Sequence, residues 1–123
     1  MSGFDGYKCL GLLKNQTADE TTSQWVDVRG RTHLVFIITG TGTTSSGVVT
    51  LEEMLPLYSP TDPKEQQEYS GTASAITTVN ASSVTGDNQS AIHAAVGAYS
   101  WVRARISTAI GGGGSISVGL VAV

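Results

Sequence analysis

Two glycine-rich stretches have the residue type that binds phosphate groups. Gly40 and Gly42 follow the apolar run 34–38, and residues 111–114 are four consecutive glycines. A dinucleotide fingerprint needs glycines that open a helix, whose N-terminus then meets the pyrophosphate. The sequence at 48–51 is instead strand-like, Val-Val-Thr-Leu, and the four glycines lack the Lys-Ser/Thr pair of a phosphate loop. We therefore interpret both stretches as turns.

Other groupings of side chains that catalysis requires are missing from the sequence. Residues 43–47 have the last glycine of a nucleophile elbow but not the first. His33 and His93 have no partner at the spacing of metal ligands. Glu52 and Glu53 occupy consecutive strand positions, so their side chains point to opposite faces and cannot act as a catalytic pair. We expect no enzyme activity, no metal and no cofactor.

One group of side chains has the composition of a protein interface. Residues 99–106 alternate, which places every second residue from Tyr99 to Arg105 on one strand face. Aromatic and Arg side chains are enriched in binding hot spots, because they bury large areas and make directed hydrogen bonds. The alternative is an ordinary outer sheet face, where Arg stems cover aromatic rings. The candidate interface residues are Trp25, Tyr99, Trp101, Arg103 and Arg105.

The elements that position these residues are predicted to be β-strands. No segment sustains the 3.6-residue period of a helix, and turn residues recur at short intervals. Strands are predicted within residues 7–13, 24–28, 33–39, 48–54, 72–79, 99–106 and 116–123, while 90–96 fits a strand or a short helix.

The predicted strands also have an expected arrangement. The strand at 33–39 is apolar enough to be buried on both faces. It is expected to form a hairpin with 48–54. Seven or eight strands with long connections at 55–67 and 80–88 indicate an all-β Greek-key sandwich or jelly roll.

Composition narrows the class of protein further. Of 123 residues, 14% are charged and the net charge is -3, which argues against a nucleic-acid binder with a basic face. Gly, Ser and Thr supply 44 residues, yet 40% of the chain is hydrophobic, enough for the core of one domain. No signal peptide or bilayer-spanning run is visible, so we expect a soluble protein made in a cytosol. Cys9 is the only cysteine, and we expect it to be a small buried hydrophobe rather than a reactive thiol.

Three stretches resemble a known family when they are taken together. They are residues 46–53, residues 69–73, and 99–106 with 111–118. They are similar to jelly-roll cement (decoration) proteins on the outer capsid of tailed bacteriophages, over roughly residues 25–123.

The resemblance implies a structural virion protein, located on the capsid surface after synthesis in the host cytoplasm. It implies a homo-oligomer, a dimer or trimer, that binds the major capsid protein and stabilises the shell. It implies no catalytic residues and no nucleic-acid or membrane partner. Residues 1–22 are expected to form an N-terminal arm or a short edge strand, and 23–123 the β-sandwich domain.

Two alternatives belong to other classes of function. One is a carbohydrate-binding jelly roll that uses Trp25, Tyr99 or Trp101 as a stacking platform. The other is a tail or fibre component of the virion.

Overall fold

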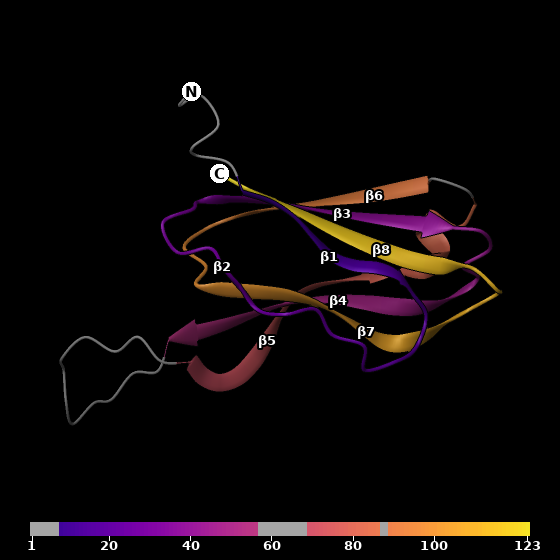
Figure 1. The fold of residues 1–123 in the computed structure, drawn as a ribbon, viewed down its shortest axis with the longest axis horizontal. Coiled ribbons are helices and arrows are strands. Elements are labelled where there is room, and N and C mark those ends of the chain that lie inside the picture. The colour runs from indigo at the N-terminus through magenta and orange to yellow at the C-terminus, as the bar shows by residue number, and fades with distance from the viewer. Residues whose placement is uncertain (1–7, 57–68, 87–88) are drawn as a thin grey trace.

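A computed structural model describes residues 8–56, 69–86 and 89–123 (Figure 1). These residues form eight strands and one short 3-10 helix, with no α-helix among them: β1 (Lys8–Gln16), β2 (Val26–Asp27), β3 (His33–Thr41), β4 (Ser46–Pro56), β5 (Tyr69–Asn80), η1 (Ala81–Val84), β6 (Gln89–Val96), β7 (Trp101–Gly111) and β8 (Ser115–Ala122). The all-β prediction is confirmed, and the ambiguous segment 90–96 is a strand. Within the same residues, no helix is long and apolar enough to cross a membrane.

The strands form two antiparallel sheets that stack face to face. Their orders are β1-β8-β3-β6 and β2-β7-β4-β5. The first strand therefore pairs with the last, the second with the seventh, the third with the sixth and the fourth with the fifth. This nesting of strand pairs is that of a jelly roll, in which one long hairpin is wrapped into a sandwich. Figure 1 shows the two layers, with β1, β3, β6 and β8 above the other sheet.

One predicted pairing is wrong. β3 and β4 do not form a hairpin, because β3 pairs with β6 and β8 in one sheet and β4 with β5 and β7 in the other. The glycine-rich link between β3 and β4 carries the chain from one layer to the other. Turn residues indicate where a strand ends, whereas the sheet that it joins depends on contacts distant in the sequence.

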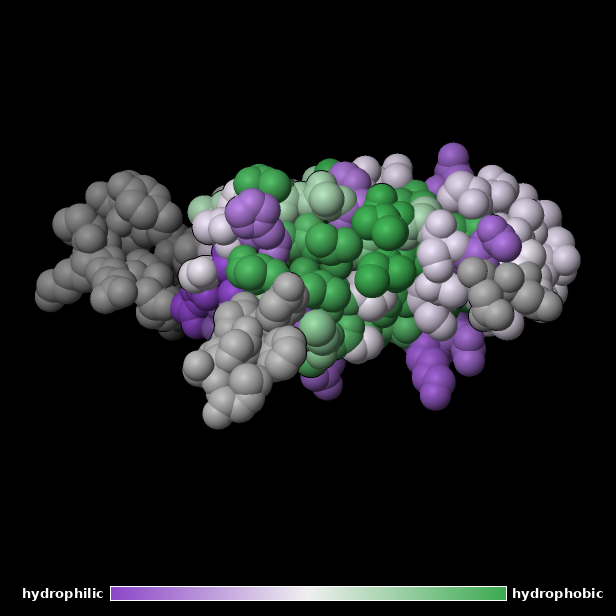
Figure 2. All heavy atoms as spheres, turned by 90° about the horizontal axis from the view of Figure 1, so that it is seen from above, coloured by the Kyte–Doolittle hydropathy of each residue, from purple (hydrophilic) through white to green (hydrophobic). Residues whose placement is uncertain are grey.

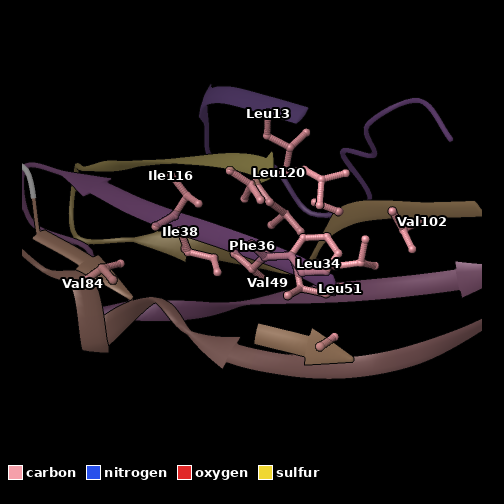
Figure 3. Packing of buried hydrophobic residues seen from close by; sticks show 14 of the residues in the cluster. Leu13, Leu34, Phe36, Ile38, Val49, Leu51, Val84, Val102, Ile116 and Leu120 are labelled. Carbon is pink, nitrogen blue, oxygen red and sulfur yellow. The ribbon is translucent and has the colours of Figure 1, made fainter. Parts of the chain in front are cut away.

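The inner faces of the two sheets form one apolar core. Leu34, Phe36 and Ile38 of β3 are buried against Val49 and Leu51 of β4 (Figure 3). These residues alternate along their strands, as a half-buried strand requires.

The 3-10 helix η1 fills one end of this core. Ala81 and Val84 are fully buried, although residues 80–88 were expected to be a polar loop. Gly40 of β3 permits the contact, because a Cβ atom there would overlap the backbone carbonyl of Val84. Residues 87 and 88 of the expected loop, and 57–67 of the expected connection at 55–67, lie outside the described residues.

The outer face of β3 departs from its prediction. Burial on both faces was expected, but Leu34, Phe36 and Ile38 are buried while Val35 and Ile37 are only half-buried. The reason is architectural: a sandwich has two layers, so each strand has one face without a covering layer. Figure 2 views this face, where apolar side chains gather over the middle of the sheet.

Candidate interaction surfaces

The outer face of the β2-β7-β4-β5 sheet holds a cluster of charges and indole rings. We call it the arginine face and define it by Trp25, Glu52, Trp101, Arg103 and Arg105. Trp101, Arg103 and Arg105 lie on alternate positions of β7, and register places Glu52 of β4 opposite Arg103. The alternating pattern therefore predicted which β7 residues share the face. It could not predict Glu52, because strand register is invisible in one sequence.

Glu52 binds both arginines of this face. Arg103 donates from Nε to Glu52 Oε1 at 2.8 Å, and Arg105 donates from Nε to Oε2 at 3.2 Å. The Glu52 side chain is only 7% exposed, while those of Arg103 and Arg105 are 23% and 25% exposed. A second carboxylate, Glu20, accepts from Arg105 Nη1 at 2.9 Å. Each guanidinium group thus donates to at least one carboxylate of the same chain.

The indole rings of the face are covered by cations. The guanidinium carbon of Arg103 lies 4.4 Å from the centre of the Trp25 ring, within the range of a cation–π contact. Arg29 makes the same contact with Trp101 at 4.6 Å, and Trp101 itself is only 5% exposed. The Trp101 ring therefore packs within the chain, whereas Trp25 is half-buried and lies at the rim of the face.

The segment 20–27, which precedes β3, brings Trp25 to this face. It runs along β7, where Glu20 N donates to Ile106 O at 2.7 Å and Ser23 N to Ala104 O at 2.9 Å. Val26 then pairs with Val102 in β2. Tyr99 does not join the cluster, since it precedes β7 and packs against the apolar core. Four of the five candidate interface residues therefore lie together.

A second polar contact lies at the end of this segment. Asp27 accepts hydrogen bonds from the Arg29 side chain, at 2.7 Å from Nη2, and from the Arg29 backbone N–H at 3.0 Å. These bonds to Arg29 stabilise the carboxylate and lower the pKa of Asp27 to about 2. Lys8 of β1 donates to the Asp27 carbonyl oxygen at 2.8 Å, which links the two sheets at this edge.

A groove opens between the sheets beside that contact. Its volume is about 460 Å³, and it is lined by residues 10–12 of β1 and 23–27 around β2. β2 is only two residues long, so little of the second sheet covers the end of β1. Leu10, which register places beside the buried Leu120, therefore remains 41% exposed.

The outer face of the β1-β8-β3-β6 sheet is apolar. Register places Val35 beside Ala94 and Val121, and Ile37 beside Ile92 and Gly119. A shallow hollow of about 340 Å³ lies on this face where Gly11 and Gly119 oppose each other without side chains. Among the described residues, this apolar outer face carries no ion pairs like those of Glu52.

The remaining candidates for chemistry are dispersed. Cys9 pairs with Val121 at the same outer face and is exposed, so its expected burial is wrong. His33 Nδ1 lies 2.9 Å from the Thr32 hydroxyl, while His93 lies on β6 opposite Phe36. Among residues 8–56, 69–86 and 89–123, no three His, Cys, Asp or Glu side chains cluster as metal ligands would.

The sheet orders place this chain in the jelly-roll class of β-sandwiches. Neither a family model nor a curated protein matches its sequence. Among solved structures it is similar to the crystal structure of the SPBc2 prophage-derived protein YomS, with a TM-score of 0.55. The match covers 94% of this chain and 91% of that one at 10% sequence identity. Likeness at this identity establishes a shared fold.

Proposed function

We propose that this chain is a structural virion protein of a tailed bacteriophage, bound to the outer capsid as a cement or decoration protein. The observation that carries the proposal is the whole-chain likeness to a prophage-derived protein of the same fold. The resemblance of residues 46–53, 69–73 and 99–118 to decoration proteins supports the same class from the sequence. The partner is then the major capsid protein, and the chain acts as a homo-oligomer.

The surfaces of the molecule suit such a role. The exposed parts of the arginine face, with Trp25 and Arg105 at its rim, offer directed hydrogen bonds to a capsid subunit. The apolar outer face offers area to bury against a second protein. A decoration protein needs both kinds of contact, one to the shell and one to its own copies.

The test is binding to capsid shells that lack the protein. Purified chain is mixed with such shells. One portion is sedimented, a second is heated until the shells rupture, and a third is imaged. We expect co-sedimentation at a fixed stoichiometry, a higher rupture temperature and added density on the exterior. Failure to bind, with no matching density on native virions, would refute the proposal.

One observation favours glycan binding as a second candidate. The groove beside β2 combines Trp25, an aromatic platform, with the polar side chains of Gln24 and Asp27. Glycan-array binding that Trp25→Ala abolishes, with an unchanged melting temperature, would support it. An array without any signal would exclude it.

A further inference from the structure

Three of the four sheet edges carry features that prevent pairing with another chain. β2 is only two residues long. β1 presents Lys8 and Lys14, and its register with β8 shifts twice. β5 is bulged, because its register with β4 shifts between Leu51 and Glu52. Short strands, lysines and bulges are the usual means by which edges avoid association.

The fourth edge, β6, has none of these features. Its sequence is Gln-Ser-Ala-Ile-His-Ala-Ala-Val, without a Lys, Arg, Asp, Glu, Pro or Gly. Its register with β3 is unbroken from His33–Val96 to Gly40–Gln89. Within the described part of the chain, β6 pairs with β3 alone. Every second residue of such an edge directs both its N–H and its C=O away from its partner strand, so these groups are free to bond.

The side chains of this edge are apolar and exposed. Ile92 and Val96 are each 70% exposed, the highest values among the large exposed hydrophobic residues of the described chain. Both lie on the apolar outer face, since their neighbours on β3 are Ile37 and His33. A second strand beside β6 would cover these side chains and complete the backbone hydrogen bonds at the same time.

We propose that β6 pairs with β6 of a second copy, antiparallel about a two-fold axis, to give a continuous eight-stranded sheet. A second copy fits because the edge is uncharged, so two identical edges meet without repulsion. The isologous contact also closes after two copies and leaves no further unprotected edge. The inference deepens the proposed function and rests on it for the biological setting, while the pairing follows from the edge itself.

Symmetry restricts the register of this pair. A two-fold axis between antiparallel strands places one residue opposite its own copy, and opposed side chains share a face. The centre of β6 is therefore Ile92 or His93. Centring on His93 would place two imidazoles side by side, whereas centring on Ile92 places two Ile92 side chains, each 70% exposed, opposite each other. The geometry points to Ile92, with Ala94 opposite Ser90 of the second copy.

Cysteine cross-linking tests both the pairing and its register. The background is Cys9→Ser, because Cys9 is exposed. Opposed Cα atoms of an antiparallel pair lie about 4.5–5.5 Å apart, within the range that a disulfide spans. Ile92→Cys should therefore form a covalent dimer on mild oxidation. Ala94→Cys is the matched control, because the two copies of residue 94 lie about 13 Å apart, four residues along the strand.

The cross-linking result decides between the registers. Dimer formed by Ile92→Cys and not by Ala94→Cys supports the proposal. Faster cross-linking through His93→Cys would overturn the Ile92 register. Equal, slow cross-linking at all three positions would indicate random collision and overturn the pairing.

Solution mass separates this inference from the proposed function. The wild-type chain should be a dimer by light scattering. Ile92→Lys, made in the Cys9→Ser background, should be a monomer, and its melting temperature should lie within a few degrees of that of the Cys9→Ser chain. A wild-type monomer that binds capsid shells would overturn the β6 pairing and the homo-oligomer, and leave the proposed binding to the capsid standing. A cross-linkable dimer that binds no shells would support the pairing and refute the proposed function.

Discussion

Replacing Glu52 by Ala should destabilise the protein far more than replacing Glu20, although both carboxylates bind Arg105. Glu52 is nearly buried and binds two arginines, at 2.8 Å and 3.2 Å, whereas the Glu20 side chain is 70% exposed and binds one. Removing one partner of a buried ion pair costs about 3–5 kcal/mol, because it leaves an uncompensated charge. An exposed pair contributes about 0–1 kcal/mol.

The structure places the cost of Glu52→Ala at the lower end of the range for buried pairs. Arg103 and Arg105 keep about a quarter of their side-chain surface exposed, so water can partly replace Glu52. We therefore expect a loss of about 3 kcal/mol. For a chain of this length that lowers the melting temperature by about 12 °C. Glu52→Gln keeps the shape and part of the bonding, so it should lose less.

Urea denaturation of the wild type, Glu52→Ala, Glu52→Gln and Glu20→Ala measures these differences. A double-mutant cycle of Glu52→Ala with Arg103→Ala isolates the pair, and its coupling should exceed that of Glu20 with Arg105. Equal losses below about 1 kcal/mol for Glu52→Ala and Glu20→Ala would refute the assignment of a buried network.

Three further predictions concern single positions. Gly40→Ala should cost about 1–3 kcal/mol in urea denaturation, because its Cβ would displace η1, while Gly11→Ala, with no neighbour within 4 Å, should cost much less. The folded pKa of Asp27 is about 2, below its ordinary value of 3.8, so its contribution to stability is present above pH 4 and is lost as the pH falls through 2. Carboxyl NMR titration should show this pKa, and Arg29→Ala should raise it; an unchanged value would contradict the role of Arg29. Cys9 should react with a thiol reagent in the native protein as fast as in urea, and protection would contradict its exposure.

The sequence was sufficient to predict the fold class and most strands. The apolar run at 33–39 and the alternation in 99–106 are local signals, and they correspond to β3 and β7 of the structure. The hairpin of β3 with β4 was wrong, since the choice between a hairpin and a crossover depends on pairing with β6, β7 and β8. Burial of 33–39 on both faces was wrong because the sandwich has only two layers. Strong hydrophobicity indicates a strand, but only the number of layers decides which face is covered.

The candidate site, like the fold, was predicted only in part from the sequence. Periodicity along β7 predicted that Trp101, Arg103 and Arg105 share a face, and the structure adds Glu52 beneath the arginines. Each guanidinium has five N–H donors and gives Glu52 only one of them, so a partner can bond to the exposed donors without breaking the bond to Glu52. Contact through the arginine face therefore depends on its rim, on Trp25 and the exposed part of Arg105.

The apolar outer face of the β1-β8-β3-β6 sheet, with its β6 edge, differs from the arginine face in its internal contacts. Ile92 and Val96 have no covering layer among the described residues, and the N–H and C=O groups of the β6 edge have no strand partner there. Burying them replaces water contacts without breaking any bond within the chain, so the full hydrophobic gain is available for association. The two surfaces thus differ in what association would bury: the β6 edge offers exposed apolar side chains and backbone groups without a strand partner among the described residues, whereas the arginine side chains are only about a quarter exposed. Of the two surfaces, self-association should therefore use β6.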